Sequence, residues 1–378
     1  MQKRYLLTPG PTPLPPEVVR SQAQPIIHHR TEEFEQIFAV VRQDLKYVFQ
    51  TNQDVLILAS SGTGAMEAAV TNLHSAEDDV LVISGGKFGQ RWGQIASCYG
   101  LKPTVIEVEW GQAVDPAKVA QALAQNPQIK TVFCTYSETS TGALIDVKAL
   151  AAITSKTDTL LVVDSITATG VVPLPMDEWG VDVVISGSQK AFMLPPGLGF
   201  ITLSKRAWKR TETAKLPSFY FNLTKERKNQ VTNQTAYTPA ITLIIALKEA
   251  LELIRKEGLD KVFTRHQRLA NATIAGVKAL GLELFAAACP SLAVTAVKAP
   301  ANIDAGKIVK AMKKYGVTIA GGQDHLKGKI FRVSHLGYVD TFDVIIGISA
   351  LEMALKEAGY AFEMGSGVKA AQEVLLAG

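Results

Sequence analysis

A lysine, an aspartate and a glycine-rich turn follow three apolar segments of this sequence, and their types suit chemistry on a bound small molecule. Lys190 ends the segment VDVVISGSQK, just before the turn LPPGLG, and Asp164 ends TLLVVD. Open α/β sheets bind ligands at the carboxyl ends of their strands. A carboxylate is costly to bury there without a cationic partner. Taken singly, each residue could also be an ordinary loop lysine or a turn aspartate.

The glycine-rich turn lies in ASSGTGAMEAAV, where a strand passes through Ser61, Gly62 and Thr63 into a helix. Backbone N–H groups at such a helix start, with hydroxyls beside them, form a phosphate cradle. The same turn could be only a tight N-cap. Because the turn lacks both the Walker lysine and the GxGxxG spacing, a nucleotide is disfavoured. A protonated pyridine nitrogen paired with Asp164 and a phosphate at this turn would fit pyridoxal phosphate, whose ring acts as an electron sink.

The elements around these residues form an α/β pattern. From residue 55 to 203, short Val/Ile/Leu runs alternate with helical segments, as in a parallel sheet buried on both faces. Asp164 and Lys190 then face one edge of that sheet. A long helix over 238–258 and another through 280 precede new strands in 291–299, 317–322 and 329–337, which alternate with helices near 304–315 and 340–358. We therefore expect an N-terminal segment (1–20) that closes over the site, a large domain (21–260) and a small C-terminal α/β domain (261–378).

Composition excludes several other classes of protein. The 378 residues are 47% hydrophobic, and 39 basic and 35 acidic residues are spread without the dense cationic block typical of nucleic-acid binding. The cysteines Cys98, Cys134 and Cys289 lie outside any CxxC spacing, so neither a disulfide framework nor a cysteine metal site is expected. The adjacent His28 and His29 lack ligands at metal spacing, and no metal is predicted. With no apolar run of ~18 residues, we expect a cytoplasmic protein without a membrane span.

Five motifs in order give the chain a family resemblance: TPGPTPLPPEV, HHRTEEFEQIF, SGT, VVDS and SQK. Together they resemble class V, fold type I aminotransferases of the alanine–glyoxylate, serine–glyoxylate and serine–pyruvate group, over essentially the whole chain. The resemblance implies a mostly parallel seven-stranded sheet wrapped by helices, a smaller C-terminal α/β domain and pyridoxal 5'-phosphate. It also implies a homodimer with shared active sites.

The resemblance gives each cofactor residue a role. Lys190 would be the Schiff-base lysine and proton shuttle, and Asp164 the partner of the pyridine nitrogen. Phe88, where many relatives have tryptophan, would stack on the ring, and Thr139 would bond its hydroxyl. The phosphate would be held by Ser61, Gly62, Thr63 and Gln189.

Three further positions are implied for the substrate and the partner chain. Arg332 would bind the substrate carboxylate, a task that suits the two-pronged guanidinium. Gly10 belongs to the segment that closes over the substrate. Thr238 would reach the phosphate of the neighbouring subunit, although Thr235 stands where some relatives have a tyrosine that makes this contact.

The implied reaction moves an amino group from alanine or serine to glyoxylate or pyruvate by a ping-pong mechanism. Aspartate or 2-aminoethylphosphonate transamination is an alternative within the family. Cysteine desulfuration is another, but it requires a loop cysteine nucleophile and, usually, a histidine beside the lysine and over the ring, where this chain has Gln189 and Phe88. A hydrogenase-associated redox subunit is the remaining alternative, for which the three scattered cysteines supply no cluster ligands.

Overall fold

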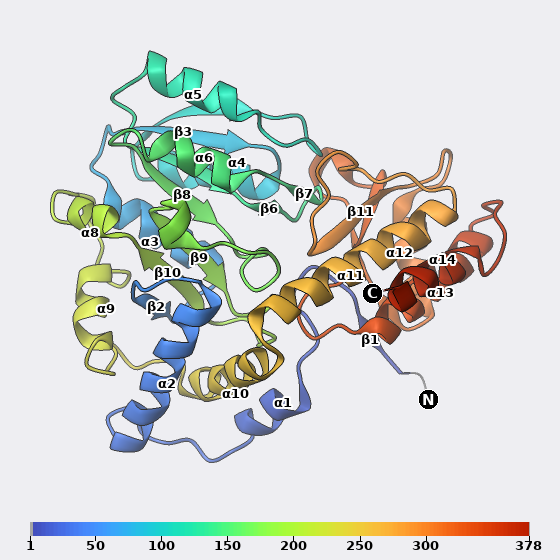
Figure 1. Ribbon diagram of the computed structural model, residues 1–378, viewed down its shortest axis with the longest axis horizontal. Coiled ribbons are helices and arrows are strands. Elements are labelled where there is room, and N and C mark those ends of the chain that lie inside the picture. Colours follow the sequence, from blue (N-terminus) through green and yellow to red (C-terminus); the bar gives the residue numbers. More distant parts are fainter. Residues whose placement is uncertain (1–2, 378) are drawn as a thin grey trace.

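A computed structural model describes residues 3–377. Its centre is a seven-stranded sheet, whose strands lie among the helices in Figure 1. Six strands are parallel, and β10 alone runs antiparallel to both of its neighbours, β2 and β9. The predicted mostly parallel sheet is thereby confirmed. In spatial order, the strands are β2 (Val55–Leu58), β10 (Gly199–Leu203), β9 (Val183–Gly187), β8 (Leu160–Asp164), β5 (Thr131–Thr135), β3 (Asp79–Ser84) and β4 (Lys102–Glu107).

Helices cover both faces of the sheet because successive strand residues point to opposite faces and both sets are apolar. Ile57 packs in one core with α2, α6 and α10, whereas Leu56 and Leu58 pack in the other with α3, α4 and α8. One strand differs from expectation, since β4 lies at the sheet edge and is largely exposed. The helices of this unit are α2 (Glu32–Val48), α3 (Gly62–Leu73), α4 (Lys87–Cys98), α5 (Pro116–Gln125), α6 (Val147–Thr154), α7 (Met176–Trp179), α8 (Lys205–Thr211), α9 (Leu223–Gln230) and α10 (Ile241–Glu257).

The C-terminal part of the chain forms a second unit with its own core. Its antiparallel sheet has the order β11 (Val294–Lys298), β14 (Ile330–Ser334) and β13 (Ala320–Gly321). The run predicted as one strand over 317–322 is split, because β12 (Val317–Thr318) pairs elsewhere. Around this sheet lie α11 (Leu259–Ala279), α12 (Ala305–Lys314), α13 (Thr341–Glu357), α14 (Ser366–Ala377) and the short 3-10 helix Asp324–Leu326.

Two segments join the units. Helix α11 places Leu259 and Val262 in the core of the large sheet and Leu269 and Val277 in the core of the C-terminal unit. The expected boundary at 260/261 therefore falls within the first turn of a continuous helix. Because the connection is a helix that packs in both cores, the two units are held in a fixed relation.

The second joining segment is the N-terminus. Strand β1 (Tyr5–Leu6) pairs in parallel with β12, and Leu7 packs in the C-terminal core. Helix α1 (Pro16–Gln22) then packs against α10 of the large unit. Between them, residues 8–15 cross from one unit to the other. No helix within residues 3–377 is long and apolar enough to cross a membrane.

Candidate active site

The strand ends named by the sequence converge on one edge of the large sheet. Strands β8 and β9 are parallel neighbours, so Asp164 at the end of β8 lies beside the chain that leaves β9 toward Lys190. Strand β2 runs the same way, because both it and β9 are antiparallel to β10. The turn that follows β2 therefore opens at the same edge. Three segments far apart in sequence thus meet there.

Asp164 is almost completely buried, and one of its carboxylate oxygens accepts a hydrogen bond from the Ile166 N–H at 2.9 Å. Burial, together with the nearby Glu138, raises the pKa of Asp164 to about 7, although the Ile166 N–H, Arg91 and Lys190 oppose the rise. Within residues 3–377 no cation forms an ion pair with this carboxylate. A protonated pyridine nitrogen would supply the missing counter-charge.

Lys190 is also buried, with its Nζ donating to the carbonyl of Pro9. Burial lowers the pKa of Lys190 to about 8, Asp164 opposes this change, and Arg332 and Arg91 add to it. A lysine with a pKa this close to neutrality can release and accept protons under physiological conditions. The backbone carbonyl of Lys190 is fixed by the Thr12 hydroxyl at 3.0 Å.

The N-terminal segment lies directly against Lys190. Gly10 has a φ of +108°, and a Cβ at this position would stand 2.5 Å from the Lys190 Nζ. The backbone conformation therefore favours glycine, and a side chain at this position would displace the end of Lys190. Gly10, expected from the sequence in a segment that closes over the substrate, thus lies beside the Lys190 amine.

The turn before α3 has the features of a phosphate site. Ser61 is the N-cap but makes no side-chain cap bond, and no described residue accepts from the N–H groups of Gly62 and Thr63. These groups are the free donors of a helix start, where the helix dipole favours an anion. A Cβ at Gly187 would stand 3.3 Å from the Gln189 Oε1 and 3.4 Å from the Gly62 N, so Gln189 lies beside the turn.

Phe88 stands in the first turn of α4, next to this site. The guanidinium of Arg91 lies over its ring, with 4.8 Å from the carbon to the centroid, and Nη1 of Arg91 donates to the Thr63 hydroxyl at 3.0 Å. Arg91 thus connects the aromatic ring with the phosphate turn. The sequence analysis missed Arg91, although its spacing of three from Phe88 places both on one helix face.

Arg332 reaches the site from β14 of the C-terminal unit. Its Nε and Nη2 donate to the Gly321 carbonyl at 3.0 and 2.8 Å, and its Nη1 donates to the Thr139 carbonyl at 2.9 Å. A guanidinium has five N–H groups, so two remain for a ligand. Burial lowers the pKa of Arg332 to about 10, which leaves it protonated at neutral pH. The hydroxyl of Thr139 shares a 2.7 Å hydrogen bond with that of Thr167, a neighbour that the sequence did not reveal.

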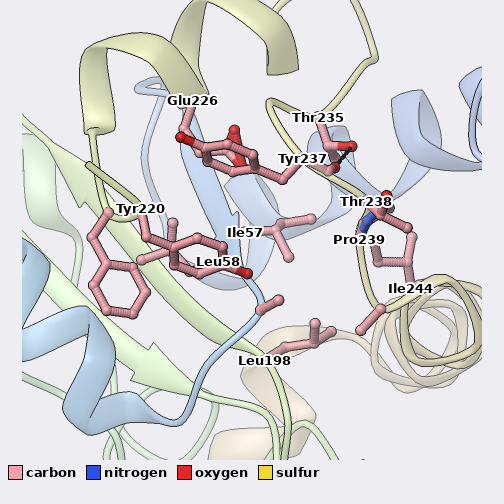
Figure 2. Close-up of a pocket in the computed structure, with 13 residues that line it drawn as sticks. Ile57, Leu58, Leu198, Tyr220, Glu226, Thr235, Tyr237, Thr238, Pro239 and Ile244 are labelled. Carbon is pink, nitrogen blue, oxygen red and sulfur yellow. Dashed lines mark hydrogen bonds between the residues drawn. The ribbon is translucent and has the colours of Figure 1, made fainter.

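Thr238 is not brought to this site within one chain. It lines a separate pocket with Tyr220, Tyr237 and Ile57, shown in Figure 2, and neither Lys190 nor the phosphate turn contributes to that lining. The hydroxyl of Thr235 is engaged with the carbonyl of Tyr237 at 2.7 Å.

The cysteines and histidines contribute no metal site. No group of three or more His, Cys, Asp or Glu side chains within residues 3–377 is arranged to hold a metal ion. Cys134 is buried, and the half-buried Cys289 donates its Sγ–H to the Gly111 carbonyl at 3.5 Å.

The free N–H groups at the start of α3, the buried Asp164 without an ion-paired cation among the described residues and the buried Lys190 fit pyridoxal phosphate, which carries a phosphate, a protonated ring nitrogen and an aldehyde. The family model "Aminotransferase class-V" matches residues 4–340. The chain therefore belongs to the class V aminotransferases, and pyridoxal phosphate is the cofactor of this family.

Relatives of known name cover almost the whole chain. It is 48% identical to the soluble hydrogenase small subunit of Synechococcus sp. (strain PCC 6716), over 99% of this chain and 98% of the relative. It is 39% identical to the serine–glyoxylate aminotransferase of Hyphomicrobium methylovorum (98% and 94%) and 37% identical to the L-aspartate–glyoxylate aminotransferase of Paracoccus denitrificans (97% and 95%). The crystal structure of the ureidoglycine–glyoxylate aminotransferase of Bacillus subtilis is similar with a TM-score of 0.95 at 30% identity, covering 100% and 99%.

The raised pKa of Asp164 predicts a pH-dependent stability for the cofactor-free protein. Because the folded state favours the protonated carboxyl, this contribution is complete below the ordinary pKa of 3.8 and is lost as the pH rises toward about 7. We expect the Asp164→Asn apoprotein to gain stability relative to wild type across this range, by at most about 4 kcal/mol. Urea unfolding at pH 4.5 and pH 8 measures the difference.

The control is Asp182→Asn, since Asp182 is equally buried but is paired with Arg206 at 2.7 Å. Loss of that pair should destabilise the protein at pH 8. A stability difference between Asp164→Asn and wild type that stays constant with pH would contradict the prediction.

Proposed function

We propose that this class V aminotransferase moves an amino group from a small amino acid, alanine or serine, to a small 2-oxo acid, glyoxylate or pyruvate, in a ping-pong reaction. The observation that carries the proposal is Arg332, which is buried, fixed by two carbonyls and left with two free N–H groups. Every substrate in this set has a carboxylate that such a fork can bind. Glyoxylate is also named for three of the relatives, with a different amino donor in each.

The side chains divide the chemistry between them. Bound pyridoxal phosphate supplies an electron sink for the charge that develops when the substrate Cα loses its proton. Lys190, with its lowered pKa, would accept the proton released from the substrate Cα and would later give up a proton from the same amine. Asp164 would keep the pyridine nitrogen protonated, and the buried Thr139 and Thr167 hydroxyls would orient the ring. The phosphate would be held by Ser61, Gly62, Thr63 and Gln189, and Phe88 would stack on the ring.

The N-terminal segment supports a preference for small substrates. The Pro9 carbonyl and Gly10 lie against the Lys190 amine, so the space above the lysine is bounded by backbone on that side. Backbone at this position limits the room for a substrate side chain next to the lysine, which favours small substrates. Aspartate remains a second candidate donor because it is named for the Paracoccus relative.

We further propose a homodimer in which Thr238 serves the partner's site. Thr238 lies outside the site of its own chain, and the aromatic side chains near it are exposed: Phe219 is 81% exposed, and Tyr220 stacks on Tyr237 with 5.2 Å between centroids. An exposed aromatic cluster of this kind is typical of a protein interface. Figure 2 shows Tyr220, Tyr237 and Thr238 around the same pocket.

A substrate panel with a Lys190 variant tests the reaction. We expect alanine or serine with glyoxylate or pyruvate to give the highest kcat/KM, and Lys190→Ala to lower activity by roughly a thousandfold because it removes the proton carrier. Borohydride should fix the cofactor covalently in wild type and in the exposed-site control Lys209→Ala, but not in Lys190→Ala. Transamination by Lys190→Ala at the wild-type rate would contradict the proposal.

Substitution of Arg332 tests carboxylate binding. Arg332→Gln should raise KM for both the donor and the acceptor by about a hundredfold, since two charge-assisted hydrogen bonds are lost. Arg332→Lys keeps the charge but not the fork, and should recover only part of the loss. Steady-state kinetics provide the measurement, with Arg206→Gln as the control distant from the site. Unchanged KM values in Arg332→Gln would show that Arg332 does not bind the substrate carboxylate.

Mixed dimers test the shared site. Lys190→Ala and Thr238→Glu should each be inactive or nearly so, the second because a carboxylate repels the phosphate. Co-expressed in equal amounts, they should recover about one quarter of wild-type activity, because half of the dimers are mixed and each mixed dimer has one intact site. No recovery would mean that Thr238 serves its own chain.

A further inference from the structure

Helix α4 carries Phe88 in its first turn but has no cap of its own. Its N-cap residue is Gly86, which offers no side chain to the free N–H groups at the helix start. If such N–H groups are buried without hydrogen-bond partners, the folded protein is less stable, so partners from elsewhere in the chain are expected. The N–H groups concerned belong to Lys87, Phe88 and Gly89.

All three donors are satisfied by residues 138–140, a segment that follows β5 in the chain. The Lys87 N–H donates to the Ser140 hydroxyl at 3.0 Å. The Phe88 and Gly89 N–H groups donate to the Oε2 of Glu138 at 3.1 and 2.9 Å. The Ser140 N–H and hydroxyl donate to the Oε1 of the same carboxylate. Glu138 and Ser140 thus form a cap supplied from outside the helix.

The cap is tight as well as complete. A Cβ at Gly86 would stand 2.4 Å from the carboxyl carbon of Glu138, and a Cβ at Gly89 would stand 2.7 Å from the carbonyl oxygen of Ile83. Glycine at both positions therefore allows the helix start to dock on Glu138. Phe88, between these two glycines, is left with little freedom to shift.

Glu138 is fully buried, which is costly for a carboxylate unless donors surround it. Four N–H or O–H groups donate to it, and the positive end of the α4 dipole faces it. A serine or aspartate at position 86 could cap the helix with its own side chain and would not require a buried carboxylate from another segment. The buried carboxylate is therefore better explained by what it holds in place than by stability alone.

The residues after Glu138 reach the other parts of the site. Thr139 accepts from Arg332 through its carbonyl and contacts Thr167 through its hydroxyl. Strand β6 (Ser137–Glu138) thus leads into a short segment that contacts the helix start of Phe88 and the arginine of the C-terminal unit. Glu138 itself contacts the start of α4, and the next residue, Thr139, contacts Arg332.

We propose that Glu138 is a positioning residue, whose carboxylate caps α4 from outside and thereby fixes Phe88 against the cofactor ring. The proposal rests on the role given to Phe88 in the proposed function. Its immediate consequence is that loss of the carboxylate loosens cofactor binding, whichever amino acid the enzyme prefers.

The experiment compares Glu138→Gln with Glu352→Gln in the full-length protein. Glu352 is a matched control, because it is buried and its carboxylate accepts the Gly365 and Val368 N–H groups at the start of α14, at 2.7 and 3.0 Å. Both variants should lower the Tm of the apoprotein. Only Glu138→Gln should raise the Kd for pyridoxal phosphate, by roughly tenfold, and weaken the visible circular dichroism of the bound cofactor.

A double-mutant cycle shows whether the effect passes through Phe88. In a Phe88→Ala background, Glu138→Gln should change the Kd by less than about twofold, because the ring that it positions is absent. A Kd and dichroism like those of wild type in Glu138→Gln, or a full tenfold effect in the Phe88→Ala background, would overturn the proposal.

If Glu138→Gln does not fold, Ser140→Ala takes its place. This variant removes the Lys87 partner and one donor to the carboxylate, and should raise the Kd by about threefold with weaker dichroism. Unchanged values would again overturn the proposal. Failure of wild type to bind pyridoxal phosphate would instead contradict the proposed function, and so the two failures are distinguishable.

Discussion

The burial of Asp164 without a bonded cation is the constraint on which the site depends. The strand that ends at this residue is enclosed on both faces, so water cannot compensate the charge. The cofactor-free protein therefore carries an energetic cost that a protonated pyridine ring removes. Since such a ligand binds only the folded chain, it also stabilises the fold. Binding of the cofactor and folding of the chain are therefore thermodynamically linked.

Charged groups of both signs lie around that carboxylate, and the positive groups outnumber the negative ones. Lys190, Arg91 and Arg332 contribute positive charge, and Asp164 and Glu138 contribute negative charge. Arg332 is held by backbone carbonyls rather than by a carboxylate, so its charge remains available to a ligand. Burial and the two arginines lower the pKa of Lys190, whereas Arg332 itself stays protonated at neutral pH.

The strands of the large sheet and the residues that end them could be predicted from the sequence, because an apolar run followed by a polar residue is a local pattern. The sequence identified Asp164 and Lys190 for this reason. It did not reveal Arg91 or Glu138, whose roles depend on contacts between segments far apart in the chain. The edge position of β4 and the division of 317–322 between two sheets were missed for the same reason: strand pairing, unlike strand composition, is not local.

The pairing of Tyr5 with Val317 has a consequence for how the protein is made. The residues that follow β1 cover Lys190, yet β1 finds its partner strand only after most of the chain has been synthesised. During translation the large sheet can form while its lysine is still open to solvent, and enclosure waits for the C-terminal unit. A chain released early by the ribosome would thus present a reactive amine that the finished enzyme conceals.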